Sequence, residues 1–352
     1  MGKDTISTTQ LMVLVWAGVL APAAEQLPGL LLPQAGRGAW LSVLAATPLV
    51  LAAGWLLRRA GGEVGLARGM TDRLGRTAGR GLLLLYMIWG ELLLALRLRL
   101  SARRLLVLGW RDGALWFFLL GVAGMALWMG RGRLSAFART GQLFLAALLA
   151  AAGVVLGLSL SQARLERLLP LSGPGVLSAL SAALPAAGVL GWGLFAAFLA
   201  DRTEKGGRGW HWGLWSVGGC LLLALAQAVI LGNLGAVLAA RLDNPFFALA
   251  KSVGVEGAFQ RVEGIISSLW TFADLAMAGV LLFALRAMAG EFSPEGDGKR
   301  TAWAAGLLAL VLAGLPIWER GTVGKWVPAG NLLLGLAVPA LLALLPAPRK
   351  KR

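Results

Sequence analysis

The stretch FQRVEGIISSLWTFADLAMAGVLLFALRAMA, residues 259–289, reads as one long apolar helix with a polar stripe. Glu263, Ser267, Thr271 and Asp274 recur at steps of four, four and three, a spacing that puts them on one helix face. At roughly 1.5 Å per residue the helix is about 45 Å long, which exceeds the hydrocarbon thickness of a bilayer. Asp274 is therefore predicted close to mid-depth, where a charge must face protein or water.

Two interpretations of this stripe stay open. It lines an ion or ligand path, or it is held in place by neighbouring helices of a packed bundle. The first predicts that Asp274→Asn weakens function far more than Glu263→Gln, because the deeper group loses more solvation. Equal tolerance of both changes counts against a path.

The composition is typical of a polytopic membrane protein. Hydrophobic residues make up 58% of the 352, charged residues only 14%, and the mean hydropathy is +0.74, more than a water-soluble core needs. We predict an all-α integral membrane protein with about ten transmembrane helices, forming a single domain over 1–352 with a disordered basic tail at 347–352. The apolar stretches lie at approximately 9–32, 39–57, 80–100, 113–129, 135–160, 173–200, 211–234, 257–289, 301–317 and 328–346.

Charge and cysteine content limit the partners and the chemistry. The net charge is +16, but the basic residues lie mostly between spans, which favours anionic membrane lipids as partners and no nucleic acid. Counting Lys and Arg on alternate sides predicts that both termini are cytoplasmic. Cys220 is the single cysteine, so an internal disulfide and a cysteine metal site are excluded. With no Walker loop, HExxH or Cys/His cluster, we predict no enzyme activity, no cofactor and no metal.

Two spans carry a proline near the middle. Pro22 follows Ala21 in the first span, and Pro185 precedes Ala-Ala-Gly188 in the sixth. Because proline removes a backbone donor and frees a carbonyl, the first helix is predicted to bend or unwind near Gly18. These spans begin two five-span halves, so the matched breaks predict a five-plus-five inverted repeat with broken first and sixth helices, whose open backbone groups suit an amino acid. The alternative is that each proline only kinks its helix.

The third span, GLLLLYMIWGELLLALRLRL, holds an acidic residue at membrane depth, Glu91. No Lys or Arg lies three or four residues away on the same helix, so the partner must come from another helix, or the carboxyl is protonated. Glu91 is accordingly a proton-relay candidate. The other interpretation is a neutral or interhelically bonded structural carboxyl.

Three segments carry a family resemblance: ISTTQLMVLVWAGVLAPAAEQLPG at the start, MGRGRLSAFARTGQLF at the fifth span, and NPFFALAKSVGVEGAFQRVEGIISSLWTFADL. The chain resembles, over essentially its whole length, the B-subunit spore germination proteins of the GerAB type. This family belongs to the amino acid, polyamine and organocation transporter superfamily. The third segment is the most specific of the three, with its Pro-led amphipathic piece and its FQRVE turn.

The resemblance implies a LeuT/APC-like permease fold in a bacterial cell membrane or spore inner membrane. It also implies that the chain works with an A subunit and a lipoprotein C subunit as a receptor for nutrient germinants such as amino acids. By position, the substrate pocket would comprise Gly18, Ala21, Pro22, Ala187, Gly188, Gly191 and Trp192. Eighth-helix hydroxyls can complete a sodium site in that superfamily, and Ser267, Ser268 and Thr271 are the available match. With Glu91 and Asp274 they form the candidate ion or proton pathway.

Three functions are compared. The leading hypothesis is a germinant-sensing subunit that binds a small amino acid at the midplane and moves one repeat against the other. The second is a proton-coupled amino acid permease in which Glu91 or Asp274 carries the proton. The third is a scaffold whose pocket is empty and which only holds partner subunits. It predicts no response to any ligand.

Overall fold

The computed structural model describes residues 4–62, 64–109, 114–169, 173–204, 210–252, 262–293, 296–318 and 320–345. For residues 108, 109, 262–265 and 320–325 it describes the backbone only. Within these ranges the regular structure is helical, apart from an isolated bridge between Ile6 and Thr203. The predicted tail at 347–352 and the start of the 257–289 span lie outside the described residues.

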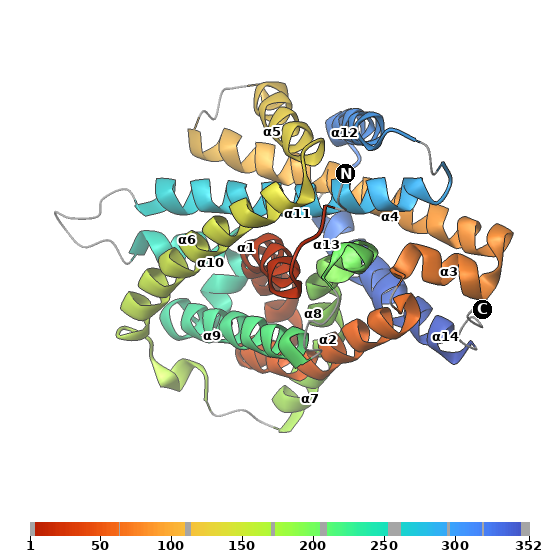
Figure 1. Cartoon of the computed structure of the whole chain (residues 1–352). Helices are drawn as coiled ribbons and strands as arrows, with labels where there is room; N and C mark the ends of the chain where they lie inside the picture. Colours follow the sequence, from red (N-terminus) through yellow and green to blue (C-terminus); the bar gives the residue numbers. More distant parts are fainter. Residues whose placement is uncertain are drawn as a thin grey trace.

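The elements follow one another along the chain as one bundle (Figure 1). They are α1 (Thr8–Ala35), η1 (Gly36–Gly38), α2 (Ala39–Gly61), α3 (Leu66–Leu74), α4 (Arg76–Gly109), α5 (Leu115–Gly130), α6 (Leu134–Leu160), η2 (Leu165–Arg167), α7 (Gly173–Ser181), α8 (Ala183–Leu190), η3 (Gly191–Arg202), α9 (Trp210–Arg241), α10 (Pro245–Ser252), α11 (Val262–Gly290), α12 (Gly298–Gly314), α13 (Arg320–Leu332), η4 (Leu333–Ala337) and α14 (Val338–Leu344).

Each predicted span coincides with a helix or a run of helices. Among the described residues, seven helical segments are long and apolar enough to cross a membrane, and the first of them, residues 8–61, contains both α1 and α2. The predicted fourth and ninth spans are shorter, at 16 residues in α5 and 17 in α12. Large apolar side chains point outward, for example Leu84, Leu85 and Ile88 of α4, as expected where lipid replaces water.

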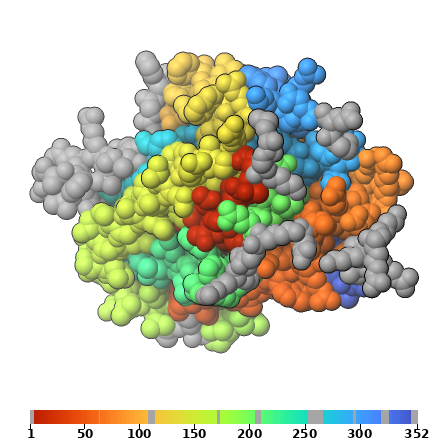
Figure 2. Space-filling view, viewed as in Figure 1, coloured from red at the N-terminus to blue at the C-terminus, as the bar shows by residue number. Residues whose placement is uncertain are grey.

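Helix α1 is the centre of the bundle, in contact with α2, α6, α8, α9 and α11. In the space-filling view only a small area of this red segment reaches the surface (Figure 2). Small residues allow the close approach: a Cβ added at Gly18 would lie 3.0 Å from the backbone of Met277 on α11. Backbone contact of this kind is how membrane helices pack without a hydrophobic driving force between them.

The first helix runs without interruption from Thr8 to Ala35, through Pro22, Pro28 and Pro33. The expected unwinding near Gly18 is not seen. Each proline removes a backbone donor and crowds the preceding turn, but a membrane helix tolerates this where neighbouring helices and side chains satisfy the freed carbonyl groups.

The sixth span is divided, as expected, but at neighbouring positions. Helix α7 ends at Ser181, α8 begins at Ala183, and from Gly191 the chain continues as the 3₁₀ segment η3. Pro185 lies in the first turn of α8, where its missing N–H costs no intrahelical bond. The discontinuities therefore flank the Pro185 to Gly188 piece.

Asp4 ties the N-terminal segment to the start of α6. Its carboxylate accepts hydrogen bonds from the backbone N–H groups of Leu134, at 2.5 Å, and Ser135, at 3.2 Å. Burial alone would raise the pKa of Asp4, but the hydrogen bonds from Ser135 and Leu134 and the charge of Arg133 outweigh it and hold this pKa below its usual 3.8.

We expect Asp4→Ala to destabilise the chain by about 0.5–2 kcal/mol at neutral pH, because the first turn of α6 loses its cap. Since the folded-state pKa of Asp4 is lowered, this stabilisation is complete above the unfolded pKa and is lost as pH falls through the folded pKa. The measurement is the melting temperature of both proteins at pH 6 and at pH 3. Asp72→Ala, at an exposed carboxyl, is the control, and a difference independent of pH would contradict the assignment.

Candidate functional site

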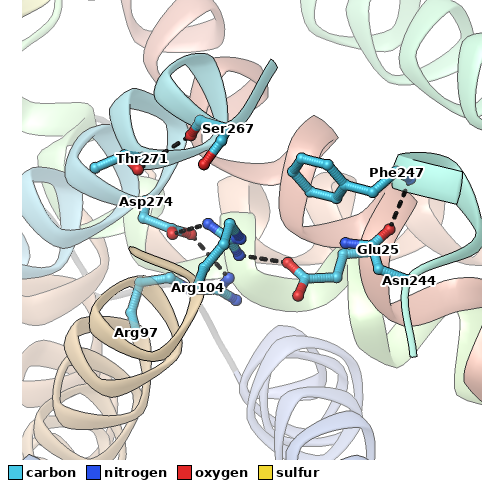
Figure 3. A network of polar contacts seen from close by, with 8 residues as sticks. All are labelled: Glu25, Arg97, Arg104, Asn244, Phe247, Ser267, Thr271 and Asp274. Atoms are coloured by element: carbon cyan, nitrogen blue, oxygen red, sulfur yellow. Dashed lines mark hydrogen bonds and ion pairs between the residues drawn. The ribbon is translucent and has the colours of Figure 1, made fainter. Parts of the chain in front are cut away.

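Four charged side chains from three helices form a buried ion network: Glu25 of α1, Arg97 and Arg104 of α4, and Asp274 of α11 (Figure 3). Asp274 Oδ1 accepts from Arg97 Nη1 at 3.2 Å, and its Oδ2 accepts from Arg104 Nη1 at 2.6 Å. Arg104 Nη2 also donates to Glu25 Oε2. Asp274 thus bridges both guanidinium groups, and Arg104 bridges both carboxylates.

The spacing of residues on α4 makes this network possible. Arg97 and Arg104 are seven residues apart, two helical turns, and therefore project from one face. Exposure of the side chains falls from 25% at Glu25 to 6% at Arg104 and 1% at both Arg97 and Asp274. The network has two positive and two negative charges, so no buried charge in it lacks an opposite partner. Removing one member would leave such a charge.

Several donors in and beside the network have no partner. They are Nε and Nη2 of Arg97, Nε of Arg104 and the indole Nε1 of Trp192, all buried and unpaired within the described part of the chain. The guanidinium carbon of Arg97 lies 4.0 Å from the ring centroid of Trp192, a cation–π contact. The inner end of the network is therefore closed by an aromatic ring.

The 3₁₀ geometry of η3 explains the position of Trp192. At three residues per turn, Trp192, Phe195 and Phe198 fall in one row, and this row faces α4. A Cβ at Gly90 would lie 2.8 Å from the Phe195 ring, and Phe198 meets Tyr86 edge to face at 5.3 Å. These three aromatic rings therefore lie on the side of η3 that packs against α4.

On the opposite side of η3 lies a cavity of about 930 Å³. Its wall is mostly apolar and is built by α1, α2, α8, η3, α9 and the α13–η4 region; it includes Thr8, Val15, Trp16, Val19, Trp55, Ala187, Gly191, Leu194, Trp212, Ser216 and Asn331. Arg58, Arg59, Asp201 and Glu204 lie at the end nearest the N-terminus. In the wall of the cavity, two hydrogen bonds hold the Asn331 side chain in place. Its Nδ2 donates to Gly188 O at 3.0 Å, and its Oδ1 accepts from Trp89 Nε1 at 3.0 Å.

The seven predicted substrate residues divide into three groups. Ala187 and Gly191 line the cavity. Gly18, Pro22 and Gly188 are buried in helix contacts, and Ala21 lines a small second void of about 30 Å³. Trp192 faces Arg97 instead of the cavity.

The predicted ion or proton pathway is also divided. Asp274 is in the ion network, whereas Thr271 Oγ1 donates to the carbonyl of Ser267 at 3.1 Å, within their own helix. Such local bonds are ordinary for a hydroxyl in a helix. Ser267 is 5% exposed, and Ser268 is the next residue along α11. The side chain of Glu263 lies outside the described residues.

Glu91 is separate from this network. It is 8% exposed, and its Oε1 has no hydrogen-bond partner among the described residues. Its carboxyl lies next to the backbone of Ala309 on α12. Six residues along α4 from Arg97, it lies about 120° around the helix from that side chain. The described residues contain no group of three His, Cys, Asp or Glu side chains able to hold a metal ion.

Sequence reasoning missed three members of the network: Glu25, Arg97 and Arg104. The predicted third span ended at residue 100 and left out Arg104, whereas α4 continues to Gly109. The seven-residue spacing of the two arginines on an extended helix was the available signal, together with an acidic residue at the same depth in the first span.

The comparison with solved structures defines the class of protein. MhsT, solved in complex with L-phenylalanine, superposes with a TM-score of 0.70 at 15% identity, over 97% of this chain and 89% of that one. In all, 81 solved chains match. The chain is an integral membrane protein with the LeuT/APC-like transporter fold.

The family follows from the sequence itself. Residues 5–291 match the family described as spore germination protein, and the chain belongs to this family. The search of curated proteins found no match.

Proposed function

We propose that this chain is the membrane subunit of a spore nutrient germinant receptor, which binds a small amino acid and works with an A subunit and a lipoprotein C subunit. One observation carries the proposal: the cavity and the ion network lie one after the other along α1. Along α1 the cavity ends at Val19 and the network begins at Glu25, six residues or about 9 Å further on.

This arrangement has the parts of a two-state device. The cavity reaches Thr8 and Glu204 near the N-terminus, a side that we propose is cytoplasmic. On the other side, the ion pair between Glu25 and Arg104 joins α1 to α4. A ligand that binds one arrangement of the helices better than the other shifts their populations, and only such differential affinity produces a signal.

A proton-coupled amino acid permease is the second candidate function. The observation that favours it is Glu91, a buried carboxyl whose Oε1 has no partner in the described part of the chain. A group of this kind can take up and release a proton during transport. Under this function Glu91→Gln abolishes accumulation driven by a pH gradient and leaves substrate binding intact.

Counterflow separates the two functions. The purified chain in proteoliposomes is given a panel of labelled amino acids, with a pH gradient imposed or collapsed and a known transporter run in parallel. A receptor subunit shows no accumulation dependent on the gradient. It also copurifies with coexpressed A and C subunits. Accumulation by the chain alone would establish the permease and contradict the receptor.

A pocket-filling variant tests the cavity. We expect Ala187→Phe to weaken amino acid binding about tenfold or more, because the new ring occupies space next to Gly191. Saturation binding to the chain in lipid nanodiscs is the measurement. Ala136→Phe is the matched control, at an exposed site on α6. Equal affinity of the two variants would place the ligand elsewhere.

A further inference from the structure

The outer end of the ion network differs from its inner end. Glu25 is 25% exposed at its side chain and contributes one oxygen, Oε2, to Arg104. Asp274 is 1% exposed and uses both oxygens. Glu25 is therefore the carboxylate of the network that water reaches and that is held by the fewer bonds.

Glu25 also has a distinct place in the bundle. Arg97, Arg104 and Asp274 all belong to α4 and α11, which remain joined without it. Among the ion pairs of the described residues, the one between Glu25 and Arg104 alone joins α1 to α4. Whatever replaces Glu25 on Arg104 releases α1 from that helix.

The two arginines have capacity for another anion. Nε of Arg104 and Nε and Nη2 of Arg97 are buried donors without partners within the described ranges. A guanidinium presents its donors in a planar fork that matches a carboxylate. Buried donors are normally satisfied, and those left over in a native structure point to a missing acceptor.

We propose that Arg104, with Arg97 behind it, binds the carboxylate of the ligand at a second position, about 9 Å along α1 from the end of the cavity at Val19, and that Glu25 occupies this position when no ligand is present. The inference rests on the proposed function for its ligand class, a small amino acid. One carboxylate replaces another, so the charge of the network is unchanged. The released Glu25 then faces the ammonium group of the ligand. Because α1 is a continuous helix through Pro22, it has no open backbone N–H groups there that could bind the carboxylate of the ligand.

The first test is chemical rescue in the full chain in nanodiscs. Glu25→Gln removes the internal carboxylate and leaves Asp274 on both arginines. We expect sodium acetate, compared with sodium chloride at equal ionic strength, to raise the melting temperature of this variant by roughly 2 °C or more. The same salt leaves the wild type unchanged, because Glu25 already fills the position.

Glu291→Gln is the matched control. The side chain of Glu291 is 26% exposed, close to the value for Glu25, and pairs with Arg68 at 3.9 Å, but Arg68 is itself 63% exposed and lies at the surface. Acetate is expected to leave this variant unchanged. An equal response of both variants, or no response of Glu25→Gln, overturns the proposed site.

The second test compares each amino acid that binds the wild type with its amide, which lacks the carboxylate. We expect at least about 30-fold weaker binding of the amide, a difference that Arg104→Gln removes and Arg104→Lys partly keeps. Arg99→Gln is the control on α4, since the hydrogen bonds of Arg99 to the described residues go to the carbonyls of Ala313 and Leu315. If Arg104→Gln still binds the amino acid more tightly than its amide, this site is overturned and the proposed function stands. Acetate rescue with no amino acid bound supports the site and contradicts the proposed ligand class.

Discussion

Replacing Asp274 by asparagine will destabilise the chain by about 3–5 kcal/mol, because Arg97 then loses its carboxylate partner in the interior and Arg104 keeps only Glu25. We also expect ligand binding to be lost, since both guanidinium groups lose the partner that orients them. The measurement is thermal unfolding of the purified chain in detergent, followed by binding in nanodiscs. A variant that melts with the wild type would show that the network does not hold α4 to α11.

Two further variants identify the cause. Glu91→Gln makes the same change at a carboxyl that is also buried but has no cationic partner within the described ranges, and we expect a much smaller effect. Asp274→Asn combined with Arg97→Gln restores the charge balance, so the double variant should be more stable than Asp274→Asn alone. Glu263→Gln remains the comparison for depth along α11, and equal sensitivity to it and to Asp274→Asn would count against a special role for the deeper group.

Gly188→Leu is expected to abolish ligand binding and to loosen the contact between α8 and α13. A Cβ at Gly188 would lie 2.4 Å from the carbonyl oxygen of Pro328 and 2.7 Å from its Cα. These are backbone atoms, so α13 must move, and overpacking of this kind costs about 1–3 kcal/mol or more. The movement also breaks the hydrogen bond from Asn331 to Gly188 O, which fixes a polar group of the cavity.

Membrane insertion should survive this substitution, because the helices keep their apolar faces. Size-exclusion chromatography of the solubilised variant checks the fold, and saturation binding checks the site. Gly153→Leu is the matched control: Gly153 is exposed on α6 and has nothing within 4 Å of an added Cβ. Binding by Gly188→Leu at wild-type affinity would mean that the α8–α13 contact does not support the ligand site.

The membrane class and the positions of the spans could be predicted from the sequence because hydrophobic length is a property of each segment taken alone. The polar stripe of α11 was equally local, and it led to Asp274. Thr271 bonds to its own helix at Ser267, and the part of these hydroxyls in an ion or proton pathway stays a prediction. A hydroxyl can satisfy itself within its helix, whereas a buried carboxylate needs a partner from elsewhere.

The partners of Asp274 depend on contacts between helices that are far apart in sequence. Arg104 lay beyond the expected third span, which ended at residue 100, and Arg97 lay within its last turn, while α4 runs to Gly109. Similarly, Pro22 predicted a break in α1 that the surrounding helices suppress. Local patterns give the elements, and tertiary packing decides which charges meet and which prolines interrupt a helix.

The most direct test of the account is saturation binding of labelled amino acids to the purified chain in nanodiscs, with the wild type beside Ala187→Phe and Asp274→Asn. We expect one amino acid, or a small related group, to bind the wild type saturably, and both variants to lose this binding while Ala136→Phe keeps it. If no amino acid binds while a reference transporter prepared in the same way binds its substrate, the chain is a scaffold and the account is contradicted.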